Sequence, residues 1–231
     1  MRDTSQLHAL LQAKLELLKS ACEKEGLKIG IGECLRTVTE QDALYAKGRT
    51  TSGSIVTNAK GSSYSSMHQW GVAFDFYRND GKGAYENKDK FFQKVGKIGQ
   101  SIGLEWGGSW KSITDLPHFQ LPYWGSTTSK LKSAYNVPAT FFKTWFSVGD
   151  KVTCTTSVYI FSKLGTKAKY NDLPNGIKAK AEKQEDGTAK FVKGKTFNIQ
   201  KIAFYNGQVY GLTKSGYYMK LIDSDGNYKF K

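Results

Sequence analysis

The sequence predicts a mixed α+β domain followed by a smaller all-β domain. In the first half, segments with helical periodicity alternate with short apolar runs, whereas after Val148 only short alternating runs separated by turns remain. At 231 residues the chain is long enough for two domains, and its hydrophobic content of 39% is enough to build their cores. We therefore expect domains over residues 1–124 and 148–231, joined by a linker over residues 125–147 that has room for one short helix.

Three helices are expected in the first domain, because apolar residues recur at steps of three and four. They cover residues 6–25, the stretch from Thr37 or Thr39 to Gly48, and residues 88–102. Threonine is a favoured helix cap at the start of a helix, and glycine is favoured after its end. His8 lies in the first turn of the first helix and is predicted to be a surface residue, since no second ligand lies near it in the sequence.

Short strands are expected between these helices, because apolar and small residues alternate there. They cover residues 27–34, 71–77, 104–106 and 115–121. Arg36 follows the first strand directly, at a strand-to-helix junction where a side chain can point into a cleft. Residues 47–65 are rich in Gly, Ser, Thr and Lys without clear periodicity. A loop of this length is typical of functional or mobile segments.

The second half alternates with the two-residue period of strands. The predicted strands cover residues 151–161, 177–182, 189–191, 196–204, 208–212 and 217–222. Asn206-Gly207 and Asp225-Gly226 are typical of hairpin turns. From Trp145 onward the chain carries 15 Lys/Arg against 7 Asp/Glu. This charge favours an anionic partner such as nucleic acid, a membrane or a cell-wall polymer, and solubility alone is the alternative.

Several classes of protein are disfavoured by the composition. No run of 18 apolar residues occurs, so no transmembrane helix is expected. The first residues lack the apolar core of a signal peptide, so we expect synthesis in the cytoplasm without entry into the general secretion route. The three cysteines are odd in number and form no C-x-x-C pair, which predicts free thiols and no disulfide framework.

Two stretches carry residues suited to metal chemistry. His68 and Asp75 lie seven residues apart in an apolar run, and Asp115 and His118 follow about forty residues later. Catalytic zinc is usually held by three protein ligands, which His68, Asp75 and His118 would provide. Asp115 is then placed to move a proton, and Arg36 to stabilise negative charge on a carbonyl oxygen. Each spacing is weak by itself, so a chance arrangement remains the alternative.

The combination of motifs resembles a family of zinc peptidases. Residues 66–76 match the pattern S-x-H-x-x-G-x-A-x-D of the family that includes the vancomycin-resistance D-Ala-D-Ala peptidases and the L-alanyl-D-glutamate endopeptidases of bacteriophage lysins. Residues 106–119 are similar to the second half of that pattern, and residues 36–59 resemble the upstream stretch in the endopeptidase branch. The likeness covers roughly residues 25–125.

The resemblance implies an α+β zinc peptidase domain with an antiparallel sheet flanked by helices. It implies zinc ligands at His68, Asp75 and His118, a catalytic carboxylate at Asp115 and a transition-state role for Arg36. Substrate-binding positions are implied at Ser66 and Gln41. Two departures from the family pattern are Gln120, where an acidic residue is frequent, and Gln69, where asparagine is frequent. Neither side chain is expected to touch a proposed ligand.

The basic, tyrosine-rich tail resembles the Src-homology-type barrels appended to bacterial lysins. Together, the resemblances imply a bacteriophage endolysin that cleaves the L-Ala–D-Glu bond of peptidoglycan and holds a wall polymer with its second domain. Such a protein is expected to be a monomer that binds no nucleic acid, inserts into no membrane, and stays in the host cytoplasm until released through a membrane pore. The alternatives are a D,D-carboxypeptidase or dipeptidase of the same family and a non-catalytic basic polymer-binding protein.

Overall fold

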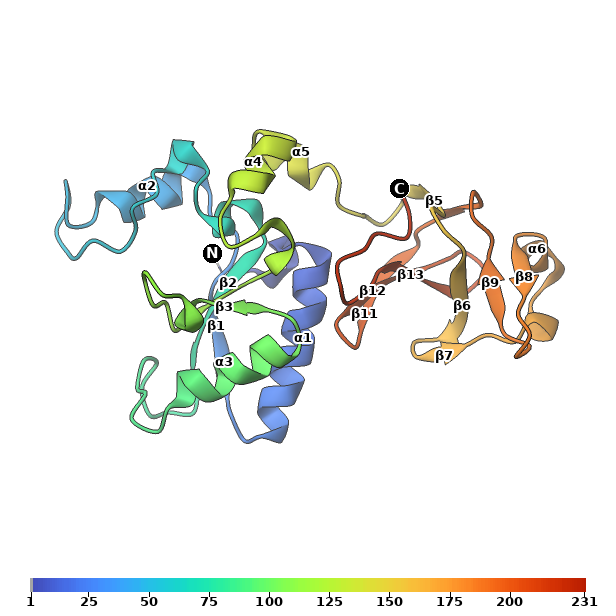
Figure 1. The fold of residues 1–231 in the computed structure, drawn as a ribbon, viewed down its shortest axis with the longest axis horizontal. Coiled ribbons are helices and arrows are strands. Elements are labelled where there is room, and N and C mark those ends of the chain that lie inside the picture. The colour runs from blue at the N-terminus through green and yellow to red at the C-terminus, as the bar shows by residue number, and fades with distance from the viewer. Residues whose placement is uncertain (1) are drawn as a thin grey trace. The chain divides into compact units, whose positions relative to one another are not determined.

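The chain divides into two compact units, Met1–Trp145 and Phe146–Lys231, and the computed structural model describes residues 2–231 of it. Figure 1 shows helices and strands mixed in the first unit and mainly strands in the second. Within residues 2–231, no helix has the length and apolar character needed to cross a membrane. The cysteines Cys22, Cys34 and Cys154 are buried free thiols, as the sequence predicts.

The first unit is built on a four-stranded antiparallel sheet with the order β1-β2-β4-β3. Its strands are β1 (Ile29–Glu33), β2 (Ala73–Arg78), β3 (Glu105–Trp106) and β4 (His118–Gln120). β2 and β4 are central, and their register pairs Phe74 with Phe119 and Asp75 with His118. The predicted α+β domain with an antiparallel sheet is therefore confirmed, and its strands lie within the predicted ranges to within one residue.

The two faces of this sheet have different roles, because side chains alternate along a strand. Phe74, Phe76 and Phe119 project from one face into the core, where the rings of Phe76 and Phe119 stack at 5.1 Å. Helix α3 (Phe91–Ser101) covers this face, and its Gly99 allows close approach of the Phe119 ring. Asp75 and His118 project from the opposite face.

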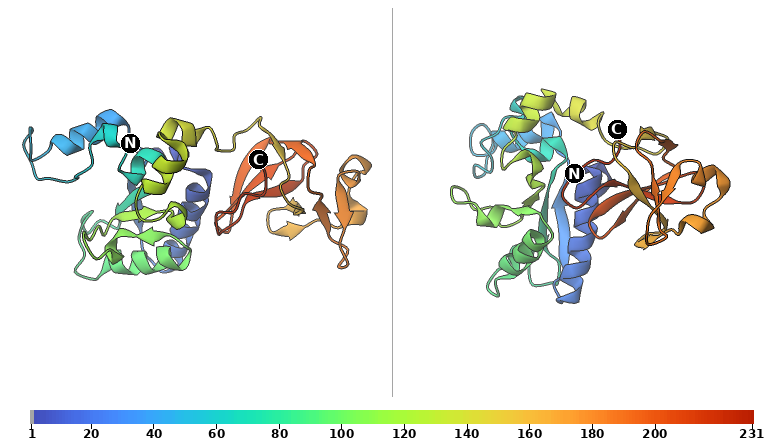
Figure 2. Two further views of the ribbon diagram at one scale, coloured as in Figure 1. Left: turned by 45° about the horizontal axis from the view of Figure 1, so that its top comes forward. Right: turned by 45° about the vertical axis from the view of Figure 1, so that its right-hand side comes forward.

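The remaining predicted helices also form. Helix α1 (Ala9–Lys24) packs beside α3 (Figures 1 and 2), and α2 (Val38–Ala46) follows Arg36. Thr37 caps α2 through a capping box, in which its hydroxyl accepts from the Glu40 amide and the Glu40 carboxylate accepts from the Thr37 amide. This box fixes the start of α2 directly after Arg36.

The predicted linker over residues 125–147 is structured for most of its length. It contains α4 (Ser129–Tyr135) and α5 (Pro138–Phe142), and the first unit extends to Trp145. The reason is an aromatic cluster in which Phe141 and Trp145 pack around His8. His8 is only 1% exposed, so the prediction of a surface histidine is wrong. Its aromatic neighbours come from segments more than a hundred residues away.

The second unit is an all-β domain, as predicted, apart from the short helices η6 (Tyr170–Asp172) and α6 (Asn175–Lys178). Its strands are β5 (Lys151–Thr153), β6 (Val158–Lys163), β7 (Thr166–Lys167), β8 (Ala181–Lys183), β9 (Ala189–Phe191), β10 (Thr196–Asn198), β11 (Lys201–Tyr205), β12 (Gln208–Leu212) and β13 (Tyr218–Ile222). The predicted strands 151–161 and 196–204 are each split in two. The predicted strand 177–182 begins instead as α6, after Pro174.

The strands of the second unit form an open path and not a closed barrel. The larger sheet has the order β11-β12-β13-β6-β9-β8 with β7 paired to β6, and β5 pairs separately with β10. β11 and β8 are thus the two ends of the path. Asn206 and Gly207 have positive φ angles of 47° and 66° and connect β11 to β12, as expected for a two-residue hairpin turn.

Candidate metal centre

Three side chains meet on the face of the first sheet that is turned away from α3. His68 Nε2, His118 Nδ1 and Asp75 Oδ1 form a nearly equilateral triangle with separations of 3.2, 3.1 and 3.3 Å. Both histidines are buried, whereas the Asp75 side chain keeps 28% of its surface exposed. The structure thus brings the three predicted ligands together and leaves one side open to solvent.

Local structure explains how these residues converge. Asp75 and His118 are direct partners in the β2–β4 register, so their side chains share a face. His68 comes from η3 (Met67–Trp70), a single turn that leads into β2 and ends at Gly71 with φ of +64°. A Cβ atom at residue 71 would lie 2.7 Å from the Trp145 ring, so only glycine allows this turn.

The donor set fits a zinc ion. A tetrahedral site with ligand distances of about 2.0–2.1 Å places neighbouring ligand atoms about 3.3–3.4 Å apart. The three observed separations lie close to this value. Two imidazoles and one carboxylate, with a fourth direction left open, are also the composition of catalytic zinc sites. The three residues are therefore able to hold a metal ion.

The second ring nitrogen of each histidine is held by an acceptor. His68 Nδ1 lies 2.9 Å from the carbonyl oxygen of Cys34, which can only accept. Nδ1 therefore carries the proton, and the lone pair of Nε2 faces the centre. Partners of this kind fix the ring orientation and the tautomer of metal-binding histidines.

A longer chain of hydrogen bonds orients His118. Trp110 Nε1 donates to Glu105 at 2.7 Å, and Gln120 Nε2 donates to the other Glu105 oxygen at 3.2 Å. Because a carboxylate can only accept, the Gln120 amide must turn its oxygen toward His118 Nε2, 3.1 Å away. His118 Nε2 is thus the donor, and Nδ1 is free to face the centre.

Gln120 therefore corrects one prediction from the sequence. It was expected to touch no proposed ligand, but its side chain directly contacts His118. The signal was present in the sequence, because residues 118 and 120 lie on one strand and share a face. Gln69 agrees with the prediction: its side chain donates to the carbonyl oxygen of Gly61 at 2.8 Å. Glu105 carried no signal, since its contact with Gln120 depends on the β3–β4 pairing. Trp110 lies within the stretch that resembles the family pattern, and its ring lies 5.1 Å from that of His118.

Arg36 is held rigidly beside the centre. Its guanidinium donates to Gln41 at 2.8 Å, to Glu33 at 3.2 Å and to Ser66 at 3.5 Å. Its backbone amide also donates to the carbonyl oxygen of His68 at 3.2 Å. A guanidinium stays charged in such surroundings. The arrangement therefore supplies a fixed positive charge next to the turn that carries His68.

The two predicted substrate-binding residues have different positions. Ser66 is half-buried and precedes η3, with its hydroxyl facing Arg36. Gln41 has no exposed surface, and its amide nitrogen donates to the carbonyl oxygen of Ala59 at 2.8 Å and to Thr57. Gln41 lies behind Arg36 and orients its guanidinium. The Gln41 side chain itself is fully buried and does not reach the protein surface.

Asp115 is half-buried in the loop before β4. Its amide donates to the carbonyl oxygen of Gly107 at 3.1 Å, and a Cβ atom at residue 107 would lie 2.6 Å from the carbonyl oxygen of Asp115. This close approach requires glycine. Burial raises the pKa of Asp115, and the positive charge that His118 can carry is the main opposing effect. A raised pKa suits a carboxyl group that both accepts and returns a proton.

The pKa values of Asp75 and His118 are shifted in opposite directions. Burial alone would raise the pKa of Asp75, but His68 and His118 together hold it far below the ordinary range of an aspartate. Burial likewise lowers the pKa of His118, and the Asp75 carboxylate overcomes this effect and raises it. The Asp75 carboxylate is therefore ionised and favours a proton on His118, which a divalent cation would have to displace in order to bind.

Comparison with known proteins places this site in a class of metallopeptidases. Residues 59–121, which include all three ligand residues, match the profile of a family described as D-alanyl-D-alanine carboxypeptidase. The peptidoglycan L-alanyl-D-glutamate endopeptidase CwlK of Bacillus subtilis is 36% identical over 127 residues, which are 51% of this chain and 74% of that protein. The chain thus belongs to the family of L-alanyl-D-glutamate peptidases.

A phage protein and a solved structure are also similar to this chain. The L-alanyl-D-glutamate peptidase of a Listeria phage is 36% identical over 110 residues, which cover 46% of this chain but only 34% of the phage protein. Among solved structures, that of the Serratia marcescens L-Ala D-Glu endopeptidase ChiX is 21% identical and has a TM-score of 0.38. The match covers 51% of this chain and 82% of that one.

Proposed function

We propose that this protein is a zinc-dependent endopeptidase that cleaves the L-Ala–D-Glu bond of the peptidoglycan stem peptide. The observation that carries the proposal is the triangle of His68, Asp75 and His118, whose ligand atoms all lie within 4.8 Å of one another. The substrate comes from the names of two relatives that are each 36% identical to this chain. A bound zinc ion would polarise the scissile carbonyl group and make the attacking water more acidic.

The residues of this chain supply the remaining chemistry. Asp115 accepts the proton of the attacking water and delivers it to the nitrogen of D-Glu as the C–N bond breaks. Arg36 stabilises the negative charge that develops on the carbonyl oxygen. Glu33, Gln41 and Ser66 hold its guanidinium in place. Charged groups that are oriented in advance stabilise a transition state without the cost of reorganisation.

Mass spectrometry of a peptidoglycan digest tests the scissile bond. We expect fragments with a new N-terminal D-Glu or D-isoglutamine. The family profile is described as a D-alanyl-D-alanine carboxypeptidase, which makes that activity the second candidate. Release of free D-Ala without new D-Glu termini would support the second candidate and reject the first.

We further propose that the second unit binds an anionic wall polymer and that the whole chain is a phage endolysin. All 15 basic residues of this unit are lysines, and some are held over tyrosine rings. Lys167 Nζ and Lys190 Nζ lie 3.6 and 4.6 Å from the ring centroid of Tyr159. A likeness of this unit to Src-homology-type domains, a monomeric state, and action at the wall after release from the host cytoplasm stay predictions.

Co-sedimentation with purified cell walls tests this second proposal. The full-length double variant K167A/K190A should bind walls at least about five-fold more weakly than the wild type, since it loses two positive charges that the Tyr159 ring holds in place. The matched control K201A/K214A removes the same charge from two exposed lysines that make no such ring contact. If both variants bind walls equally weakly, only the net charge of the unit matters for binding. If the protein binds nucleic acid in preference to walls, the non-catalytic alternative is favoured.

A further inference from the structure

One glycine joins three side chains at the His118 end of the metal centre. The carbonyl oxygen of Gly107 accepts from the backbone amide of Trp110 at 3.2 Å and from that of Asp115 at 3.1 Å. A Cβ atom at residue 107 would lie 3.1 Å from the Cβ atoms of both Asp115 and His118. The side chains of Trp110, Asp115 and His118 therefore leave the backbone from one small region.

The Trp110 ring lies against a ligand residue and is not fully covered. Its centroid is 5.1 Å from that of the His118 ring, with an angle of 48° between the two planes. Its one polar atom, Nε1, donates to Glu105 at 2.7 Å. Because Trp110 is only half-buried, the rest of the indole offers hydrocarbon surface beside the centre. Aromatic surface of this kind suits an apolar part of a substrate.

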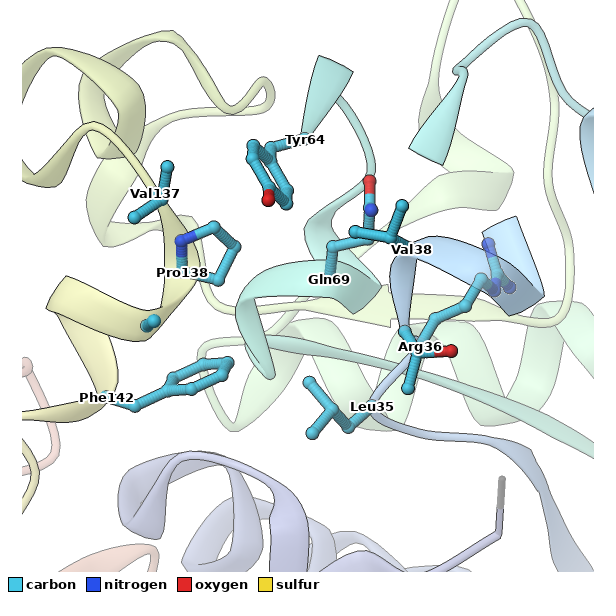
Figure 3. A pocket seen from close by; sticks show the side chains of 10 residues that line it. Leu35, Arg36, Val38, Tyr64, Gln69, Val137, Pro138 and Phe142 are labelled. Carbon is cyan, nitrogen blue, oxygen red and sulfur yellow. The ribbon is translucent and has the colours of Figure 1, made fainter. Parts of the chain in front are cut away.

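The guanidinium of Arg36 lies at the other end of the centre, beside His68. The backbone amide of Arg36 donates to the carbonyl oxygen of His68, and the guanidinium donates to Ser66. Figure 3 shows the guanidinium turned away from the apolar pocket beside α5, so this pocket does not receive the group that the guanidinium binds. Arg36 is thus associated with one ligand histidine and Asp115 with the other.

This separation sets the direction of the scissile bond. In the proposed reaction, the carbonyl oxygen of L-Ala faces Arg36, and the nitrogen of D-Glu receives a proton from Asp115. The residue attached to that nitrogen therefore lies on the side of Asp115 and Trp110. In the stem peptide, D-Glu continues through its γ-carboxyl group. Its Cβ and Cγ methylene groups are therefore part of the main chain that has to pass Trp110.

We propose that the Trp110 ring packs against the two methylene groups of D-Glu and thereby selects a γ-linked residue after the scissile bond. Trp110 is then a specificity-determining residue in addition to a partner of Glu105. Burial of one methylene group strengthens binding about four-fold, so the loss of one methylene group should weaken binding by this factor. The inference rests on the proposed function and adds which residue recognises the D-Glu side of the bond.

Two substitutions and two substrates test the proposal in the full-length protein with zinc in excess. The substrates carry γ-linked D-Glu or β-linked D-Asp, which is one methylene group shorter. In W110A, the ratio of KM for the D-Asp peptide to KM for the D-Glu peptide should fall at least about four-fold. W110F keeps an aromatic face and loses the donor to Glu105, so it should keep the wild-type ratio. An unchanged ratio in W110A, or an equal fall in both variants, would overturn the proposal.

Ligand NMR separates this inference from the proposed function. The full-length variant D115N keeps the three ligand residues and lacks the carboxylate that moves the proton. When it binds a stem peptide, the ring current of Trp110 should move the D-Glu methylene proton signals upfield, and D115N/W110A should show no such shift. This result does not depend on cleavage, so the two proposals can fail separately. A Trp110-dependent shift of the alanine methyl signal alone, or no Trp110-dependent shift, would overturn the inference.

Discussion

The first unit buries its three histidines in two different surroundings. His8 lies against aromatic rings, with those of Trp124, Phe141 and Trp145 at 5.3–5.9 Å, and burial lowers its pKa to about 3. His68 and His118 are equally buried but share the Asp75 carboxylate. Burial alone therefore does not mark a functional histidine. The carboxylate, and the acceptors behind each ring, distinguish the metal centre from the aromatic cluster.

The largest expected effect is the difference between substituting a histidine in the metal centre and substituting the histidine in the aromatic cluster. H68A should bind no zinc at the centre and should lose peptidoglycan cleavage, because two ligands rarely hold catalytic zinc. H8F, the matched substitution in the aromatic cluster, should keep zinc and most of the activity. Atomic absorption measures the zinc content, and the loss of turbidity of a wall suspension measures peptidoglycan cleavage. Retained cleavage by a folded H68A protein would rule out the zinc mechanism.

The second-largest expected effect concerns the hydrogen-bond acceptors that hold the second ring nitrogen of each ligand histidine. Q120L leaves His118 Nε2 without its acceptor, so the ring is free to change its tautomer and orientation. Substitutions of such partners typically weaken metal binding about 10- to 100-fold, and we expect a loss in this range from zinc titration against a competing chelator. Q100L changes an exposed glutamine on α3 and serves as the control. Equal zinc affinity in Q120L and the wild type would contradict a role for the Trp110–Glu105–Gln120 chain.

Loosening the guanidinium of Arg36 should have an intermediate effect on the reaction rate and no effect on zinc binding. Q41L removes one acceptor from the guanidinium without touching a ligand residue. A hydrogen bond to a charged group contributes about 1.5–3 kcal/mol, so we expect kcat to fall by roughly ten-fold or more. Zinc content should stay at the wild-type level. A fall in zinc content that matches the fall in kcat would show that Gln41 supports the metal centre as a whole.

The last effect concerns stability and not the reaction, and is a pH dependence that arises from His8. The pKa of His8 is about 3 in the folded protein and about 6.5 in the unfolded chain. Between these values the unfolded state binds the proton and the folded state does not. Stability is therefore complete above pH 6.5 and falls as the pH is lowered toward 3, by up to about 1.4 kcal/mol per pH unit.

Urea unfolding of the wild type and H8F at several pH values measures this contribution. Carboxylates that titrate in the same range affect both proteins alike, so the difference between them isolates His8. The wild type should lose stability relative to H8F as the pH falls below 6.5. Parallel curves would show that the ring is protonated within the aromatic cluster.

Comparing the two surroundings also shows what the sequence could reveal. The spacing of His68 and Asp75 places one residue on an entry turn and the other on the strand that follows, so convergence could be predicted from local structure. His118 was expected as the third ligand from the residue types alone, and the family resemblance supported this expectation. The structure brings all three ligand atoms together, while metal binding itself stays a prediction.

The errors arose where distant segments meet. His8 could not be placed in the core because its neighbours Trp124, Phe141 and Trp145 come from the other end of the unit. The same packing explains why residues 129–142 form helices and not a linker. The error at Gln120 is an exception, because its contact with His118 is local and strand alternation places the two side chains on one face. In the second unit, alternation predicted strands but not the order in which they pair.

The central claim is that one zinc ion, held by His68, Asp75 and His118, cleaves the bond between L-Ala and D-Glu. Its most direct test is a titration of zinc into chelator-stripped protein, with new N-terminal D-Glu counted by mass spectrometry. We predict no cleavage in the stripped protein and activity that rises linearly to a plateau at one zinc per chain. Full cleavage by the stripped protein, or a plateau without D-Glu termini, would contradict the account.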